Sequence, residues 1–471
     1  MNAKIFFGST EAIKENLSQR KSPYSGDVVS TAPICDSEDT IKALKIAEMA
    51  TKDAKSSTLS QRCSWLLDVA QKLKENKEDI AQTITDEVGK PIAFARVEVE
   101  RCIETVTLSA ETMRTMHGET INTDAMASGK KTLSYFSRVP VGVVACITPF
   151  NFPLNLVAHK LAPALVAGNT VVLKPTPEAP LTAYKFAKLF IESEFAVKDA
   201  LSVVYGDAEV GGTLVSSDIP RVISFTGSVP VGNIITKSAG IKKVGLELGG
   251  NAATYVDTSA DLDLAASRCA LGAFVNSGQV CISLQRIYVN EKIYDQFALK
   301  MAEETKKLKV GSPYDDDTFM GPLIDDEAAD RAMGWVESAI KEGAKALLEP
   351  KKDGRMFNPC VMADVRDDMA IVCEEVFAPI VSLVKVKDFD DALPRMNNSP
   401  YGLQFSVFTN DLRITQRAIE ELDAGGIVIN DMPTLRFDIQ PYGGVKLSGV
   451  GREGPRFAIE EMTEIKSVVI C

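Results

Sequence analysis

The middle of the chain alternates short apolar runs with stretches of helical periodicity. The expected strands cover residues 141–147, 170–174, 201–205, 221–225 and 243–246, and the expected helices between them cover residues 154–167, 179–194, 209–216 and 231–238. Strands buried on both faces of a parallel sheet read as continuous apolar runs, and helices cross over between them. The pattern therefore predicts an α/β fold with a doubly wound domain of the nucleotide-binding type.

The region before this alternation is predicted to be helical. Residues 40–117 carry apolar residues at spacings of three and four, with expected helices at 59–76 and 78–88. Ser37 or Asp39 is the candidate N-cap of a further helix that runs through residue 50.

Further elements follow Gly250. A chain of 471 residues exceeds what one hydrophobic core supports, so two or three domains are expected. A second alternating stretch contains an expected helix at 262–275 and expected strands at 285–289 and 425–430. Two polar, strand-like pieces at 131–138 and 464–470 fit neither core, so we expect them to pair with each other and to form an edge open to strand addition.

Composition narrows the classes of partner. The formal charge of -12 and the absence of a dense Lys/Arg run argue against nucleic acid or an anionic membrane surface as the main partner. The nine cysteines form no Cys-x-x-Cys pair, which is typical of reduced thiols rather than a disulfide framework or a metal site. The N-terminus lacks the pattern of a signal peptide, and no apolar stretch reaches about 18 residues. We therefore expect a cytoplasmic protein without a membrane segment or a bound metal.

Three segments carry candidate chemistry. Cys281 lies in the run 278–283, Glu247 precedes Leu-Gly-Gly, and Asn151 lies within Pro-Phe-Asn-Phe-Pro. They supply a thiol nucleophile, a carboxylate able to activate water and an amide able to hold an oxyanion, which are the parts that an acyl-enzyme route needs.

Two glycine patterns compete as a dinucleotide site. Residues 449–454 match G-x-G-x-x-G, but the pattern also needs an acidic residue about 20 positions on, and only 17 residues remain. We interpret that segment as a turn. Residues 225–228 with Gly232 lie between an expected strand and an expected helix, where backbone amides can approach a pyrophosphate.

These segments and several others resemble the aldehyde dehydrogenase superfamily, from about residue 20 to the end of the chain. The matching segments, in family order, are 149–153, 172–175, 225–228 with Gly232, 246–250, 278–281, 374–379, and 441–444 with Lys446, Ser448 and Gly449. The resemblance implies that Cys281 attacks an aldehyde. It also implies that Asn151 and the Cys281 amide hold the oxyanion, and that Glu247 directs water onto the thioester.

The resemblance also implies a division of the chain. A Rossmann-like dinucleotide-binding domain is expected at 1–118 and 141–250, a second α/β catalytic domain at 251–450, and a small β oligomerisation arm at 119–140 and 451–471. By the same resemblance, the arm builds a homodimer or a homotetramer.

Binding of NAD or NADP is implied for a set of residues that the family pattern selects. They are Ile147, Thr148, Pro149, Phe150, Lys174, Thr176, Asp207, Gly211, Phe225, Thr226, Gly227, Ser228, Gly232, Leu248, Gly249, Glu375 and Phe377. The Glu-x-Phe spacing selects Glu375 rather than Glu374.

Two departures leave the choice between NAD and NADP open. Pro177 replaces the glutamate that often follows the lysine by three residues in NAD-preferring members, whereas Asp207 adds a charge in a loop that often carries glycine. A third departure, Ala378 in place of the usual glycine, is a small change.

The substrate pocket is predicted from positions rather than from a motif. Phe152, Leu156, His159, Val280 and Ile282 match family positions that line the tunnel to the thiol. The loop 431–440 should close that tunnel.

Two arginines are candidates to supply positive charge to that pocket. Arg101 and Arg436 either bind an anionic tail of the substrate or form structural ion pairs.

The resemblance thus indicates an NAD(P)-dependent aldehyde dehydrogenase that acts on a small oxygenated aldehyde such as lactaldehyde or glyceraldehyde. Succinate semialdehyde and phosphorylated or sulfonated aldehydes are alternatives. A CoA-acylating enzyme is a further alternative, which the presence of Glu247 disfavours. A catalytically silent member of the family is disfavoured by the intact set of Cys281, Asn151 and Glu247.

Overall fold

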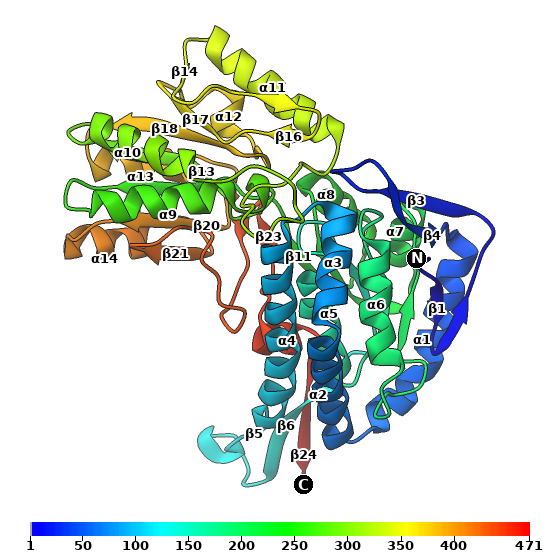
Figure 1. The fold of residues 1–471 in the computed structure, drawn as a ribbon. Helices are drawn as coiled ribbons and strands as arrows, with labels where there is room; N and C mark the ends of the chain where they lie inside the picture. Colours follow the sequence, from blue (N-terminus) through cyan, green and yellow to red (C-terminus); the bar gives the residue numbers. More distant parts are fainter. Residues whose placement is uncertain (1) are drawn as a thin grey trace.

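The computed structural model describes residues 2–471. Figure 1 shows two α/β units that lie side by side, each with helices packed against a sheet, and a β arm that extends from one of them. The predicted α/β architecture is confirmed.

The first sheet has eight strands. In spatial order they are β2 (Thr10–Ala12), β1 (Ile5–Phe7), β9 (Leu201–Val203), β8 (Thr170–Lys174), β7 (Val143–Ile147), β10 (Pro220–Thr226), β11 (Lys243–Glu247) and β23 (Gly449–Val450). The five strands from β9 to β11 are parallel, and the outer strands pair antiparallel. The strands predicted between residues 141 and 246 are confirmed to within two residues at each end.

Helices cover both faces of this sheet. The crossover helices are α5 (Asn155–Val166), α6 (Pro180–Ile191), α7 (Ala208–Ser216) and α8 (Val229–Ser238), and the N-terminal helices are α1 (Ser37–Ser56), α2 (Leu59–Glu75), α3 (Lys77–Val88) and α4 (Ile92–Thr115). All twelve residues of α5 are buried because the helix is enclosed between the sheet and α4. Asn155 and Leu156, in the first turn of α5, line the cavity described below.

The start of α1 differs from the prediction. The N-cap is Asp36, whose side chain accepts a hydrogen bond from the backbone N–H of Asp39, while the Asp39 carboxylate accepts one from the backbone N–H of Asp36. Neither Ser37 nor Asp39 is the cap, so that prediction was wrong. Asp39 instead completes a reciprocal capping box, in which two otherwise unpaired amides are satisfied.

The second sheet has seven strands. In spatial order they are β14 (Lys345–Ala346), β17 (Cys360–Ala363), β18 (Ile380–Val386), β13 (Leu284–Asn290), β12 (Ala252–Val256), β20 (Gln404–Phe408) and β21 (Gly426–Ile429). Its helices are α9 (Leu262–Phe274), α10 (Tyr294–Lys306), α11 (Asp326–Lys341), α12 (Ala370–Cys373), α13 (Phe389–Asn397) and α14 (Leu412–Glu421). The helix and the two strands predicted after Gly250 are confirmed as α9, β13 and β21.

The predicted pairing of the two polar strand-like pieces is confirmed. β24 (Thr463–Ile470) runs antiparallel to β6 (Leu133–Pro140) along its whole length, and β5 (Glu119–Thr120) adds a third strand. Helix α15 (Pro455–Glu461) leads into β24. The end of this ribbon that carries the C-terminus of the chain points away from the two α/β units (Figure 1).

Shorter elements complete the chain. They are β3 (Leu17–Lys21), β4 (Val28–Pro33), β15 (Lys352–Asp353), β16 (Met356–Phe357), β19 (Tyr401–Gly402), β22 (Val445–Lys446), and the 3-10 helices η1 (Thr123–Ala125) and η2 (Val275–Gly278). Within residues 2–471, no helix combines the length and the apolarity needed to cross a membrane.

The order of strands in the first sheet locates a ligand crevice. From β7 the chain moves outward through β8 and β9, and then returns to the other side of β7 for β10 and β11. Loops that leave the carboxyl ends of β7 and β10 therefore diverge and open a crevice between them, which is where doubly wound sheets bind ligands.

Candidate active site

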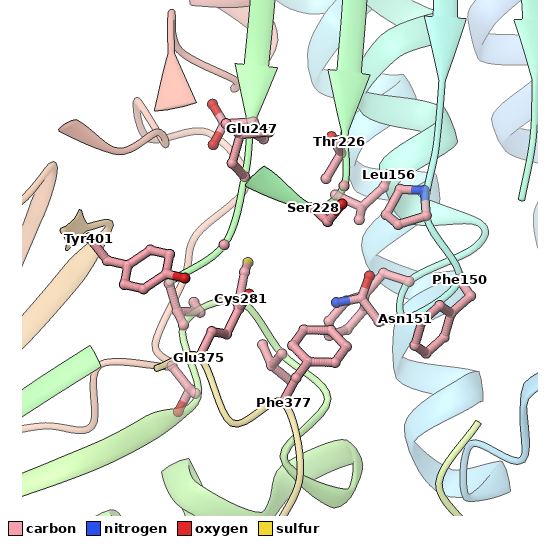
Figure 2. A pocket seen from close by; sticks show the side chains of 18 of the residues that line it. Phe150, Asn151, Leu156, Thr226, Ser228, Glu247, Cys281, Glu375, Phe377 and Tyr401 are labelled. Carbon is pink, nitrogen blue, oxygen red and sulfur yellow. The ribbon is translucent and has the colours of Figure 1, made fainter. Parts of the chain in front are cut away.

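A cavity of about 590 Å³ opens at these carboxyl ends, and residues of both α/β units line it. We call it the central cavity. The predicted residues that line it are Arg101, Pro149, Phe150, Asn151, Phe152, Leu156, Thr226, Gly227, Ser228, Glu247, Leu248, Gly249, Val280, Cys281, Ile282, Glu375, Phe377 and Arg436. Figure 2 shows Cys281 between Glu247 on one side and Asn151 on the other. The fold thus brings together three residues that lie far apart in the sequence.

Other predicted residues lie outside this lining. They are Ile147, Thr148, His159, Lys174, Thr176, Asp207, Gly211, Phe225 and Gly232. Most of them lie at or just beyond the carboxyl ends of β7, β8, β9 and β10, so they flank the central cavity along the same edge of the sheet.

A tight loop presents Cys281. Asn276, Ser277 and Gly278 have left-handed backbone angles, with φ of 52°, 56° and 73°. A Cβ atom at Gly278 would lie 2.3 Å from the backbone oxygen of Ala378, so the close approach of these two loops requires glycine. The approach places the thiol beside the loop that carries Glu375 and Phe377.

Asn151 is fixed at the opposite wall. Its side chain is 5% exposed, and its Nδ2 donates a hydrogen bond to the backbone oxygen of Gln279 at 3.1 Å. The amide nitrogen faces Cys281 (Figure 2). An amide nitrogen has two N–H groups, so the second one is available to a ligand atom beside the sulfur.

Glu247 is the last residue of β11, and its carboxyl group is turned away from Cys281 (Figure 2). Its Oε1 lies close to Gly443, where a Cβ atom would approach it within 2.8 Å, and its Oε2 has no hydrogen-bond partner among the described residues. Burial, followed by the charge of Glu453, raises the pKa of Glu247 well above its ordinary value. A carboxyl group with a raised pKa is a stronger base once it is ionised.

Buried charges surround Glu247. Lys160 Nζ donates to Glu453 Oε1 at 2.9 Å and to Thr226 Oγ1 at 2.7 Å. Arg436 Nη2 donates to Glu453 Oε2 at 3.2 Å. Lys160 and Glu453 were not identified from the sequence, because an isolated lysine and an isolated glutamate carry no spacing signal.

A second group of charges meets at Asp438. Arg101 donates two hydrogen bonds to this carboxylate at 2.8 and 2.9 Å, and His159 Nε2 lies 3.0 Å from it. His159 is 2% exposed and does not line the central cavity, because it packs behind the loop that carries Arg436. Burial and Arg436 lower the pKa of His159, so the imidazole is neutral at physiological pH.

Tyr442 is a further residue that the sequence did not single out. Its hydroxyl oxygen lies 2.9 Å from Sγ of Cys281, and its ring centroid lies 3.7 Å from the guanidinium carbon of Arg436. Burial raises the pKa of Cys281 to about 11, while the hydrogen bond from Tyr442 and the charge of Arg436 oppose this rise. The signal in the sequence that could have identified Tyr442 is its position in the Pro-Tyr-Gly-Gly segment.

The edge of the sheet fits a dinucleotide. The turn between β10 and α8 presents backbone N–H groups at a helix N-terminus, and a Cβ atom at Gly232 would lie 2.7 Å from the side chain of Leu248. The hydroxyl group of Thr148 is buried without a hydrogen-bond partner among the described residues. Phe150 and Phe377 meet edge to face, with 6.0 Å between ring centroids. Within the described chain, no cluster of His, Cys, Asp and Glu is arranged to bind a metal ion.

Glu375 and Lys174 are two further charged residues that the sequence assigned to the cofactor. Glu375 Oε1 accepts a hydrogen bond from the backbone N–H of Gly250 at 2.9 Å, and burial raises its pKa to about 7. Lys174 is 7% exposed, and burial lowers its pKa although the charges of Glu178 and Asp207 oppose the shift. Glu178, which the sequence analysis did not consider, also accepts a hydrogen bond from the Thr176 hydroxyl group.

Comparison with known proteins agrees with the motif analysis. The sequence profile described as the aldehyde dehydrogenase family matches residues 10–468. The 3-sulfolactaldehyde dehydrogenase of Priestia aryabhattai is 43% identical over 450 residues, which cover 95% of this chain and 93% of that protein. The lactaldehyde dehydrogenase of Methanocaldococcus jannaschii is 41% identical over 454 residues, which cover 95% of this chain and 96% of that protein.

A solved structure agrees with these relatives. The NADP-dependent glyceraldehyde-3-phosphate dehydrogenase from Bacillus halodurans C-125, complexed with NADP, superposes with a TM-score of 0.97 and is 34% identical. The match covers 100% of this chain and 99% of that one. The chain therefore belongs to the aldehyde dehydrogenase family, whose members oxidise aldehydes with NAD or NADP.

Proposed function

We propose that this enzyme oxidises a small 2-hydroxy aldehyde, such as lactaldehyde or glyceraldehyde, to its carboxylate. The observation that carries the proposal is the convergence of Cys281, Asn151 and Glu247 on one cavity, beside a sheet edge that fits a dinucleotide. The names of the two relatives, a lactaldehyde and a sulfolactaldehyde dehydrogenase, support a substrate of this kind.

In the proposed reaction, Sγ of Cys281 attacks the carbonyl carbon of the aldehyde and forms a carbon–sulfur bond. The oxygen atom, which gains negative charge, accepts hydrogen bonds from Nδ2 of Asn151 and from the backbone N–H of Cys281. A bound dinucleotide would supply the hydride acceptor for this carbon, and loss of the hydride would leave a thioester on Cys281.

Hydrolysis then releases the product. Glu247 rotates from the position that it has beside Gly443, takes a proton from a water molecule, and so directs the oxygen onto the thioester carbon. The carbon–sulfur bond breaks, the carboxylate leaves, and the thiolate of Cys281 is restored. After this rotation, a proton acceptor would lie beside the thioester, which favours water over CoA as the acyl acceptor.

For the cofactor, we assign the phosphates to the amides at the start of α8 and the adenosine ribose to Lys174 and Thr176. Glu375 and Phe377 would hold the nicotinamide end. The Glu178 carboxylate lies against Thr176 and acts on Lys174, so it would repel a 2'-phosphate and favour NAD over NADP. The expected domain limits, 1–118 with 141–250 for the cofactor and 251–450 for the nucleophile, belong to the same proposal.

A sulfonated or phosphorylated three-carbon aldehyde is the second candidate substrate. Arg101 and Arg436 both line the central cavity. Arg101 pairs with Asp438, and Arg436 pairs with Glu453 through Nη2 and with Asp438 through Nε at 3.5 Å, so both positive charges are partly neutralised. The place of the Arg436 guanidinium group in the cavity lining is the feature that favours an anionic tail.

A substrate panel tests this proposal. Lactaldehyde, glyceraldehyde, succinate semialdehyde, 3-phosphoglyceraldehyde and 3-sulfolactaldehyde are each assayed with NAD and with NADP, and kcat/KM is compared. We expect the largest values for lactaldehyde and glyceraldehyde, with NAD preferred, and a free acid as product with or without CoA. A preference for succinate semialdehyde, which has no 2-hydroxyl group, would contradict the proposal, and so would an acyl-CoA product.

A pair of cysteine variants tests the nucleophile. Cys281→Ala should abolish aldehyde oxidation and retain dinucleotide binding, whereas Cys373→Ala, at an exposed thiol, should keep the parent activity. Equal activity of the Cys281→Ala variant would place the chemistry elsewhere.

The subunit arrangement and the compartment complete the proposal. The ribbon of β5, β6 and β24 offers exposed apolar side chains along an outer strand, which supports a homodimer or a homotetramer built through this arm. All nine cysteines are unpaired, which is typical of a reducing compartment and supports a cytoplasmic location.

A further inference from the structure

The hydroxyl group of Tyr442 lies directly beside the sulfur of Cys281. Its Oη is 2.9 Å from Sγ, and among the described residues no other side chain makes a hydrogen bond to that sulfur. Tyr442 is 6% exposed, and its ring packs in a small apolar cluster with Val280, Ile282 and Leu403. The packing holds the hydroxyl group in a defined position relative to the sulfur.

We propose that Tyr442 is a further catalytic residue, whose hydroxyl group donates a hydrogen bond to the Cys281 thiolate and stabilises it before the aldehyde is attacked. This proposal rests on the role of Cys281 as the nucleophile in the proposed function.

The direction of the hydrogen bond follows from the number of protons. A thiolate has no proton to donate, so in the ionised state of Cys281 the phenol must be the donor. Burial and the neighbouring sulfur both raise the pKa of Tyr442 well above its ordinary value, so the phenol keeps its proton. The proton that leaves Sγ therefore goes to water rather than to Tyr442.

Arg436 strengthens this donor. Its guanidinium carbon lies 3.7 Å from the centroid of the Tyr442 ring, and its position is fixed by Glu453, with an N–O distance of 3.2 Å, and by Asp438, with one of 3.5 Å. A cation over the ring face withdraws electron density from the phenol, which makes the O–H a better donor. The same positive charge favours a nearby thiolate. Arg436 is thus a positioning residue that acts through Tyr442.

The other groups around the Cys281 sulfur show why this hydrogen bond matters. The ionisable groups that act on Sγ are Tyr442 and Arg436, which favour the thiolate, and Glu375 and Glu247, which oppose it. Burial also opposes ionisation. Neither histidine helps, because His159 contacts Asp438 and Arg436, while His117 bonds to the backbone oxygen of Thr115. A thiol in such surroundings needs a donor to become a nucleophile near neutral pH.

The Tyr442→Phe variant tests the proposal, because it removes the hydroxyl group and keeps the ring. The full-length protein is treated with iodoacetamide over a series of pH values, without aldehyde or dinucleotide, and the alkylated Cys281 peptide is quantified by mass spectrometry. We expect the pH midpoint of alkylation to rise by about one to two units, the size of a hydrogen bond to a charged group. At neutral pH, this shift corresponds to labelling that is roughly tenfold to hundredfold slower.

A matched control separates the hydrogen bond from a general change in the cavity. Tyr401 also lines the central cavity, but its hydroxyl group makes no hydrogen bond to Cys281. Tyr401→Phe should therefore keep the parent midpoint. A midpoint that is equal in Tyr442→Phe and in the parent protein would overturn the proposal.

A second replacement at position 442 should shift the pH midpoint of Cys281 alkylation in the opposite direction. Incorporation of 3-fluorotyrosine at position 442 makes the phenol more acidic and a stronger donor while it preserves the shape of the ring. The midpoint of Cys281 alkylation should then fall below that of the parent, which a purely structural role of Tyr442 would not cause. A midpoint that is unchanged or higher would contradict the proposal, and this variant decides the question if Tyr442→Phe does not fold.

The labelling experiment is independent of the proposed function. It uses no substrate, so an unmoved midpoint in an enzyme that oxidises aldehydes refutes only the role of Tyr442. If the parent protein oxidised none of the aldehydes but the midpoint still shifted in Tyr442→Phe, the proposed function would be refuted and the role of the hydrogen bond would stand.

Discussion

Two opposing influences act on the carboxyl group of Glu247. Burial and the negative charge of Glu453 raise its pKa, whereas Arg436, Lys160 and Arg452 lower it. Below the raised pKa the group is protonated and cannot accept a proton from water. Above it, the group is a carboxylate and a stronger base than an exposed glutamate. Thioester hydrolysis should therefore increase as the pH rises through this pKa, while attack by Cys281 follows the ionisation of the thiol.

Glu247→Gln isolates this step, because the amide cannot accept a proton. We expect a burst of reduced dinucleotide of about one equivalent per active site, followed by turnover that is roughly 10² to 10⁴ times slower than in the parent. Stopped-flow absorbance measures both phases. The control is Glu374→Gln, a change of the same kind at an exposed residue of the same cavity, which should turn over as the parent does. Parent-like turnover of the Glu247 variant would mean that another group activates the water.

At the scale of single elements, the loop of η2 determines where the thiol lies. Gly278 has a φ of 73° and touches the backbone of Ala378. Gly278→Ala should force the two loops apart, with about 1 kcal/mol or more of strain from the left-handed backbone alone. We expect kcat/KM to fall at least tenfold, together with a lower melting temperature. The control is Gly334→Ala on α11, where a Cβ atom meets nothing within 4 Å, and which should preserve both quantities. Unchanged kinetics at position 278 would show that the loop adapts without moving the sulfur.

The elements also show which features the sequence could predict. The core strands β7, β8 and β10 were predicted to within two residues because each is a continuous apolar run that a parallel sheet buries. The short strands β1 and β2 were not predicted, because three residues carry too little periodicity. The cap of α1 was placed wrongly because several polar residues compete within four positions, and only the geometry selects Asp36.

The sequence likewise identified some residues of the site and missed others. Cys281, Asn151 and Glu247 were identified because each lies in a segment of distinctive composition. Tyr442 was missed because its contact with Cys281 joins residues 161 positions apart, and neither periodicity nor spacing reports such a contact. His159 was expected to line the tunnel. Its imidazole instead contacts Asp438, which lies on a loop far away in the sequence, and this contact holds it outside the cavity lining.

At the scale of the whole molecule, the central cavity exists only where the two α/β units meet. Asn151 and Glu247 belong to the first sheet or the loops that leave it, whereas Cys281 and Phe377 belong to the second unit. Any motion between the units changes the distances on which the reaction depends. The third part of the chain, the β ribbon, contributes no residue to the lining of the central cavity.

The outer strand of that ribbon provides the last test. Ile465 and Val469 lie two strand repeats apart on one face of β24, and they are 59% and 56% exposed. In the oligomer that we propose, these exposed apolar side chains would lie at the contact with another subunit. In the double variant Ile465→Lys, Val469→Lys, two charges would have to be desolvated at that contact, so we expect the oligomer to dissociate to monomers in light scattering. Leu412→Lys, at an apolar residue of α14 that is 79% exposed, makes the same type of change outside the ribbon and should leave the assembly intact. An oligomer that survives the double variant would have to be built through another surface.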